Sequence, residues 1–262
     1  MQNAEFRVNT EKCNGCGLCL KVCPGNMVGG DVLRMEGRHP VMTDQSKFGW
    51  QGCWRCQHCL AVCPNGAVSV LGVSADQVPG KPDAVIREEL PKLMKYRRTC
   101  RSFRRAEADS STIDEILDAV SAVPTGGNNN RLEFSVIYSR EAMSRLYCAV
   151  FGEKAQGDLS SLRLYDAPHL FIAHKASGER FRDGDFIEMS LATAYFELLA
   201  NAYGLGTVIS TYAAELLSKN VEARRILRIP EDHRFTAVVG FGYPAYEYAR
   251  GISKRRKIFK IS

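Results

Sequence analysis

The sequence has no run of about 18 consecutive apolar residues, the length that a helix needs to cross a bilayer. Its beginning, Met1–Arg7, carries no apolar stretch of the kind found in secretory signals. The glycine pair Gly204 and Gly206 is not completed to G-x-G-x-x-G, which leaves little support for a Rossmann-type dinucleotide site. We therefore expect a cytoplasmic protein with no membrane partner.

The composition is that of a globular protein. The 262 residues fit two unequal domains better than one, although length is only a soft guide. A hydrophobic fraction of 45% with 24% charged residues argues against a fibrous or disordered chain. The net charge of +6 is compatible with nucleic acid, an acidic protein or a phosphate-bearing cofactor, and does not choose among them.

Cysteine is the residue whose placement is most informative. Ten cysteines without a secretory signal, most of them clustered early in the chain, indicate metal ligation rather than disulfides. Two segments repeat the spacing C-x-x-C-x-x-C-x-x-x-C-P. Eight cysteines form these two motifs: Cys13, Cys16, Cys19 and Cys23 in the first, and Cys53, Cys56, Cys59 and Cys63 in the second.

This spacing is that of bacterial ferredoxins, in which the fourth cysteine ligates the other cluster. Three thiolates converge on one face of a 4Fe–4S cube, and the fourth begins a diverging segment. We therefore expect one cluster on Cys13, Cys16, Cys19 and Cys63, and another on Cys53, Cys56, Cys59 and Cys23. A pair of zinc sites is the alternative, because paired C-x-x-C elements also bind zinc.

Composition divides the chain. Residues 1–72 read as a small ferredoxin-like domain, the Gly- and Pro-rich segment within 73–88 as a linker, and 89–262 as a second domain. The insertion Val28–Met42 carries Gly-Gly and Glu-Gly turns and predicts a hairpin. No role is assigned to Cys100 or Cys148, which are expected to be inert thiols.

Helical and strand-like patterns alternate in the second domain, which predicts an α+β fold. Residues 185–203 are apolar on nearly every face, so this helix should be buried on most sides, at the domain centre or a subunit interface. The other expected helices are 110–122, capped by Ser110 or Ser111, 141–151 and 213–227, and the expected strands are 133–138, 169–174, a short strand after Gly204, and 235–240.

Two further motifs carry a resemblance. Tyr96–Phe103 reads YRRTCRSF and Pro124–Asn130 reads PTGGNNN, and in this order they resemble the nitroreductase family over roughly residues 89–262. With the cysteine motifs, the chain looks like a ferredoxin–nitroreductase fusion. The resemblance implies a three-layer α/β/α domain that binds FMN at the subunit interface of a homodimer.

The resemblance also implies which residues contact the cofactor. Arg97, Arg98 and Thr99 match the phosphate and ribityl contacts, and guanidinium groups suit a phosphate dianion. Arg101 aligns with a basic residue at the flavin pyrimidine edge, where its charge would make the flavin easier to reduce. Lys254 and Arg256 fall where the family closes the phosphate site. A solvated basic face is the alternative for the Arg97–Arg101 run, and a nucleic-acid or membrane patch is the alternative for Lys254–Lys257.

Two more segments match the family. The loop residues Pro124, Thr125, Gly126, Asn128 and Asn130 would come from the second subunit, although an ordinary Asn/Gly turn also explains them. After Asn130 the sequence departs from the family's usual Gln-Pro-Trp. The main chain of Ile209, Ser210 and Thr211 would face the reactive flavin edge.

Together these features predict an oxidoreductase that passes electrons through two clusters to FMN and reduces a small electron-poor acceptor, such as a nitroaromatic or a quinone. The donor would be a ferredoxin-like protein or NAD(P)H, and no catalytic side chain is required. The alternative is an electron-transfer module for a protein partner. Nucleic-acid binding is not expected, because no aromatic residues accompany the basic runs. Four histidines show no metal or triad spacing and are interpreted as structural or surface residues: His39, His169, His174 and His233.

Overall fold

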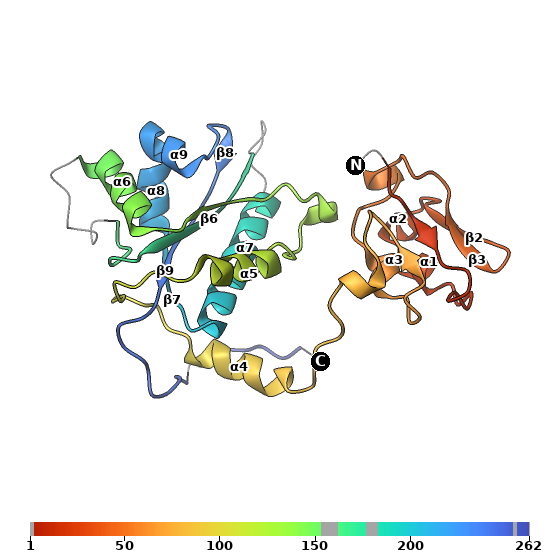
Figure 1. Cartoon of the computed structure of the whole chain (residues 1–262), viewed down its shortest axis with the longest axis horizontal. Coiled ribbons are helices and arrows are strands. Elements are labelled where there is room, and N and C mark those ends of the chain that lie inside the picture. Colours follow the sequence, from red (N-terminus) through yellow and green to blue (C-terminus); the bar gives the residue numbers. More distant parts are fainter. Residues whose placement is uncertain (1–2, 153–161, 177–182, 254–255, 262) are drawn as a thin grey trace. The chain divides into compact units, whose positions relative to one another are not determined.

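The computed structural model describes residues 3–152, 162–176, 183–253 and 256–261. It divides the chain into two units, drawn in Figure 1. The first comprises residues 1–83 with the loop 125–130, and the second comprises residues 84–124 and 131–262. The division falls inside the segment 73–88 that composition identified as a linker, and a helix already begins within that segment, at Ile86.

The first unit consists of short elements. Two small antiparallel sheets form, one from β1 and β4 and one from β2 and β3. The hairpin expected within residues 28–42 is present, with Glu36 opposite His39 and a turn at Gly37, whose φ of 58° favours glycine. The elements are β1 (Arg7–Val8), α1 (Leu18–Lys21), α2 (Pro24–Met27), β2 (Leu33–Glu36), β3 (His39–Met42), a 3-10 turn Gly49–Gln51, α3 (His58–Ala61), β4 (Val68–Ser69) and a 3-10 turn Ala75–Gln77.

The second unit is built on one antiparallel sheet with the strand order β5-β6-β9-β7, and β8 adds to the edge of β6. Its strands are β5 (Glu133–Ile137), β6 (His169–Ala176), β7 (Gly206–Ser210), β8 (His233–Arg234) and β9 (Val238–Gly242). Its helices are α4 (Ile86–Tyr96), α5 (Ser110–Val120), α6 (Arg140–Phe151), α7 (Asp183–Ala202), α8 (Thr211–Lys219) and α9 (Val221–Leu227).

Both faces of this sheet are buried, and β6 shows why. Its side chains alternate, as strand geometry requires: Leu170 and Ile172 join the core beneath α6, α8 and α9, whereas Phe171 and Ala173 join the core beneath α5 and α7. Figure 1 shows these two helical layers on opposite sides of the sheet. The predicted α+β class and the three-layer arrangement are confirmed.

Three local expectations were wrong. The helix expected over 213–227 is two helices, because Asn220 interrupts the first and caps the second by accepting a hydrogen bond from Ala223 N at 2.8 Å. Helix α5 is preceded by Asp109 rather than capped by Ser110 or Ser111. Strand β9 starts at Val238, three residues later than expected.

Helix α7 also differs from expectation. Residues such as Met189 and Phe196 are buried, but Phe186 is 51% exposed and Ile187 is 55% exposed. A helix that is apolar all round thus leaves part of its apolar surface uncovered in the single chain. Among the described residues, no helix has the length and apolarity to cross a membrane.

Candidate functional site

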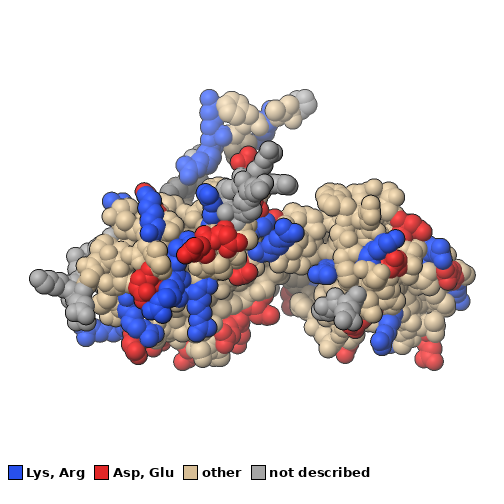
Figure 2. All heavy atoms as spheres, turned by 90° about the horizontal axis from the view of Figure 1, so that it is seen from above, with Lys and Arg blue, Asp and Glu red and all other residues tan. Residues whose placement is uncertain are grey.

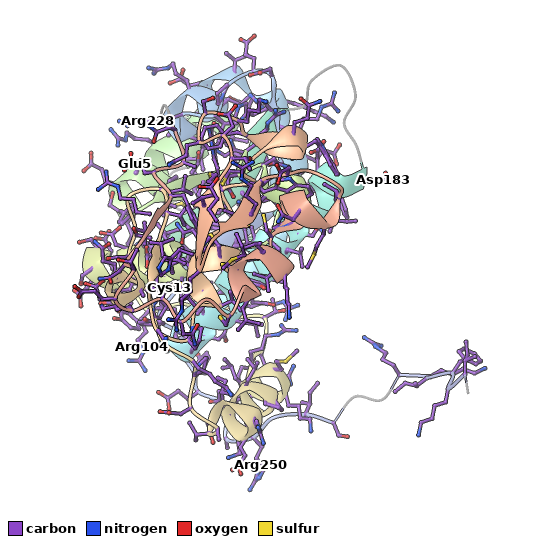
Figure 3. The ribbon with its side chains drawn as sticks, turned by 90° about the vertical axis from the view of Figure 1, so that its right-hand side faces the viewer. Glu5, Cys13, Arg104, Asp183, Arg228 and Arg250 are labelled. Atoms are coloured by element: carbon purple, nitrogen blue, oxygen red, sulfur yellow. The ribbon has the colours of Figure 1, made fainter. Side chains whose placement is uncertain are left out.

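The first set of four cysteines lies together. One small cavity in the first unit is lined by Cys13, Cys16, Cys19 and Cys63, that is, three thiols of the first motif and the last thiol of the second. Gly15 and Gly17 adopt left-handed φ angles of 75° and 68° between the first three cysteines, which turns the chain tightly enough for their side chains to converge. Cys13, labelled in Figure 3, begins this turn.

The complementary set also lies together. The negative charges of Cys53, Cys56 and Cys23 all act on Cys59, and together with its burial they raise the pKa of this thiol to about 12, burial being the largest cause. The turn in this second motif has the same left-handed geometry as the first, but at Arg55 and Gln57, with φ of 55° and 57°. Each set therefore draws three thiols from one motif and one from the other.

The chemistry of these sets fits iron–sulfur clusters. Burial raises the pKa of Cys19, Cys53 and Cys56, so these three thiols become stable thiolates only when they are bonded to metal cations. Backbone N–H groups donate to two of the sulfurs: Ala67 N to Cys63 Sγ at 3.2 Å and Arg55 N to Cys53 Sγ at 3.4 Å. Such donors offset thiolate charge.

In the second unit, the arginine-rich segment is anchored beside β7. Thr99 forms an isolated parallel bridge with Thr207, and Cys100 N donates to Thr207 O at 2.7 Å. Gly206 permits this approach, because a Cβ there would lie 2.7 Å from Cys100 Cβ. The segment is therefore held at close range along the strand that leads to Ile209.

Two cavities flank this segment. One, of about 340 Å³, is lined by the side of the segment that carries Arg97 and Arg98. The other, of about 220 Å³, is lined by Thr99 together with the end of β7. Arg101 lines both cavities. Seven of the predicted cofactor residues thus surround the two cavities: Arg97, Arg98, Thr99, Arg101, Ile209, Ser210 and Thr211.

The charges at this site are only partly balanced. Arg97 Nη1 pairs with Glu197 Oε1 of α7 at 3.0 Å. Burial raises the pKa of Glu197, and the charge of Arg97 opposes that rise. The buried Nε of Arg98 has no hydrogen-bond partner within the described chain. A guanidinium with an unmatched donor, close to two further arginines, fits a phosphate group.

Glu197 was missed by the sequence reasoning. It is an isolated acidic residue in the otherwise apolar stretch Tyr195–Leu199, and this isolation was a usable indication of a specific partner. Ser210 carries a second unanticipated role: its Oγ accepts from Ala213 N at 3.0 Å and so caps α8. The end of β7 is therefore fixed in place.

The predicted loop residues are divided between the two units. Pro124 belongs to the second unit, whereas Thr125, Gly126, Asn128 and Asn130 belong to the first. Within the first unit, Asn128 Nδ2 donates to Trp54 O at 3.0 Å. The loop was expected to serve the site of a second subunit, and that expectation stays a prediction.

Of the two predicted basic residues near the C-terminus, the structure describes only one. Lys254 lies outside the described residues, and Arg256 is exposed. The segment before them is held near the end of α4, where Ile252 N donates to Lys95 O at 3.1 Å, and Figure 3 shows Arg250 beside that helix. On the face drawn in Figure 2, basic and acidic side chains of the second unit are interspersed.

Comparison with known proteins defines the class of each unit. The family model described as "Nitroreductase family" matches residues 94–243, and that described as "4Fe-4S dicluster domain" matches residues 12–67. The first unit therefore carries an iron–sulfur domain and the second a nitroreductase fold. The chain belongs to the nitroreductase family, and the predicted fusion with a ferredoxin-like domain is confirmed. It is an oxidoreductase of that family.

Individual relatives agree with this assignment. A protein of Archaeoglobus fulgidus, provisionally named an NADH dehydrogenase/NAD(P)H nitroreductase, is 28% identical over 162 residues, covering 61% of this chain and 88% of that protein. A nitroreductase with bound FMN from Bacteroides fragilis is 20% identical, with a TM-score of 0.56 over 67% of this chain and 100% of that one. Another with bound FMN, from Desulfitobacterium hafniense, is 17% identical, with a TM-score of 0.55 over 67% of this chain and 99% of that one.

Proposed function

We propose that this chain is an iron–sulfur flavoprotein oxidoreductase in which two 4Fe–4S clusters and FMN form one redox chain. Its acceptor is a small electron-poor molecule of the nitroaromatic or quinone class, and its donor is NAD(P)H or a ferredoxin-like protein. The names of the relatives support a nicotinamide donor, and the fused iron–sulfur domain supports a donor that delivers single electrons.

The two sets of cysteines would hold the clusters. Cys13, Cys16, Cys19 and Cys63 would ligate one, and Cys53, Cys56, Cys59 and Cys23 the other. When bound, such clusters carry one electron at a time. The protein's part is to hold four thiolates in a fixed geometry and to direct backbone N–H groups at the sulfurs, since hydrogen bonds to sulfur tune reduction potential.

The observation that carries the flavin assignment is the gathering of Arg97, Arg98 and Arg101 around two cavities, with Arg101 lining both and the end of β7 lining the second. Arg98, with its unmatched Nε, and Arg97 would bind the phosphate, and Thr99 the ribityl chain. Arg101 would place a positive charge at the pyrimidine edge. FMN, when bound, supplies two-electron chemistry from one-electron donors, so no side chain need act as a nucleophile.

A second copy of the chain would complete the site. The loop Thr125–Asn130 belongs to the first unit, whereas both cavities are lined by residues of the second, and α7 leaves Phe186, Ile187 and Tyr195 exposed. An apolar helix face of this kind is buried when two chains associate. The proposed homodimer would cover that face and bring the partner's loop to the flavin.

The first test is anaerobic purification followed by iron, sulfide, zinc and flavin analysis of one sample. We expect about eight iron atoms and eight sulfides per chain, the content of two 4Fe–4S clusters, and about one FMN. Clusters without flavin would contradict the proposal and favour an electron carrier that serves a protein partner. Zinc in place of iron would remove the iron–sulfur part.

The second test concerns Arg101. Replacing it by glutamine removes the charge that would stabilise reduced flavin, so the flavin potential should become more negative in Arg101→Gln. The matched control is Arg105→Gln, which removes an equally exposed arginine that lines neither cavity. Equal potentials in the two variants would show that Arg101 does not lie at the flavin.

A further inference from the structure

Three side chains with metal-binding atoms meet at the edge of the second unit's sheet, and none of them lines either arginine-flanked cavity. They are Glu133 of β5, His174 of β6 and His233 of β8, and one donor atom of each lies within 4.8 Å of the others. Strand register brings them together: Glu133 is directly opposite His174, and His233 is opposite Ala176, two residues further along β6. Both histidines are buried.

Hydrogen bonds determine the tautomer of His174. Ser135 Oγ lies 2.7 Å from Leu227 O, and a carbonyl only accepts, so the single hydroxyl proton of Ser135 is donated there. His174 Nε2 lies 3.0 Å from the same Oγ and must therefore donate to it. The other nitrogen of this neutral imidazole, Nδ1, then carries a lone pair rather than a proton.

That lone pair faces the second histidine. His174 Nδ1 and His233 Nδ1 are 2.8 Å apart, so His233 Nδ1 donates the one proton that lies between them. A metal ion bound by both histidines needs a lone pair on each Nδ1. If the proton of His233 moves from Nδ1 to Nε2, the lone pair of His233 Nδ1 becomes available. Both rings stay neutral in this change, and no proton is lost.

We propose that the side chains of Glu133, His174 and His233 form a binding site for a first-row transition-metal dication of the Zn²⁺ type. The two Nδ1 atoms and one carboxylate oxygen are three ligands, the number that zinc often takes from a protein while a water completes its tetrahedron. Imidazole ligands favour Zn²⁺, Ni²⁺ or Cu²⁺ over Mg²⁺ or Ca²⁺.

Hydrogen bonds already hold the ring of His174 in the orientation that metal binding needs. Metal-bound histidines usually donate their second N–H to a fixed acceptor, which holds the ring in orientation. The chain His174 Nε2 to Ser135 Oγ to Leu227 O supplies that arrangement from β6, β5 and the end of α9. These contacts orient the Nδ1 lone pair before any ion binds.

Binding is opposed by a change of geometry and by a like charge. Nitrogens bonded tetrahedrally to zinc are about 3.3 Å apart, so the two Nδ1 atoms must separate by roughly 0.5 Å, and both rings must turn so that the directions that now face each other meet at the ion. His233 lies on a strand of two residues at the sheet edge, where a shift of this size is least hindered. The positive charge of Arg224, which donates to His233 O at 2.8 Å, repels a cation, and the carboxylate of Glu133 offsets it.

The test uses cluster-loaded full-length protein, with Zn²⁺ as the probe under anaerobic conditions. After incubation with zinc chloride and desalting, we expect about one zinc per chain, with iron and sulfide unchanged, and a raised melting temperature of the second unit. His233→Gln should lose this zinc. Equal zinc in the two proteins, or zinc gained only as iron is lost, would overturn the proposal.

A second pair of variants guards against misfolding of the histidine variant. Glu133 is exposed, so Glu133→Gln should fold normally and yet weaken zinc binding by more than about 100-fold, the upper end of what loss of an outer partner costs. Glu231→Gln removes an exposed carboxylate from the nearby turn and should leave the affinity unchanged. Equal zinc affinities in these two variants would exclude Glu133 as a ligand and contradict the site.

Discussion

The two units of this molecule differ in what holds them together. In the second unit, apolar residues are buried on both faces of one sheet, in two separate cores. In the first, the core is small, and three of its helices are four residues long. Helices this short have no stability of their own. Packing therefore stabilises the second unit, whereas the first depends on its ligands.

The largest expected effect comes from removing a ligand from the first unit. Cys59→Ser should abolish one cluster and unfold most of residues 3–83, because the buried thiols lose the cations that balance them. Residues 84–124 and 131–152, which belong to the second unit, should keep their protection. Limited proteolysis with mass spectrometry distinguishes the two units. Cys148→Ser, outside both motifs, is the control. Equal protection of the first unit in the two variants would show that this unit does not depend on its ligands.

Shortening a buried side chain of the second unit should destabilise that unit and leave the first intact. Phe171 is fully buried in β6 and stacks on Phe196, with ring centroids 4.1 Å apart. Phe171→Ala should therefore lower the free energy of unfolding of the second unit by about 3–5 kcal/mol and leave the iron content unchanged. Denaturant titration measures this loss. Phe259→Ala, at an exposed position, should cost less than about 0.5 kcal/mol.

Two asparagines, each just after a cysteine motif, test how much hydrogen bonding contributes to the stability of the first unit. The side chain of Asn26 donates to Leu33 O at 2.7 Å and accepts from Val32 N and Leu33 N, both at 3.0 Å. Asn26→Ala should cost about 2 kcal/mol of unfolding free energy, because three backbone groups lose their partner.

Asn65 is the matched control, since it follows the second motif. It makes one exposed hydrogen bond, to Lys12 O at 2.9 Å, so Asn65→Ala should cost about 1 kcal/mol or less. Denaturation of both variants with their clusters intact provides the comparison. Similar losses would mean that the clusters alone determine the stability of this unit.

The smallest expected effect is the contribution of His169 to the pH dependence of the second unit. Burial lowers the pKa of His169 below its usual 6.5, partly opposed by the charge of Glu107. As the pH falls below 6.5, the unfolded chain therefore binds a proton before the folded chain does, and stability decreases until the folded pKa is passed. The free energy of unfolding falls by about 1.4 kcal/mol for each pH unit that separates the folded and unfolded pKa values of His169.

Unfolding of wild type and His169→Gln at several pH values would test this. The variant has no titrating group at this position, so its stability should fall less between pH 7 and pH 5. Parallel curves for the two proteins would show that the buried imidazole does not contribute. The result would also show whether packing alone determines the stability of the second unit.

Patterns confined to short stretches of sequence predicted much of the fold. Helix α6 and strand β5 lie within a residue or two of their expected bounds, because their periodicity is local. The break at Asn220 was missed, since asparagine within an apolar pattern reads as a surface residue until its side chain is seen to cap a new helix. For Phe186, apolarity predicted burial but did not say whether the domain core or a second subunit covers the side chain.

The iron–sulfur domain, the nitroreductase family and the proposed ligand sets could be predicted from sequence alone, because the cysteine motifs and the arginine-rich motif each lie within a few residues. Only the tertiary structure brought Glu197 to Arg97, 100 positions apart, and His233 to His174, 59 positions apart. Neither pair has a local spacing that reveals it. Strand register and helix packing decide such contacts, and both depend on the burial of the whole core.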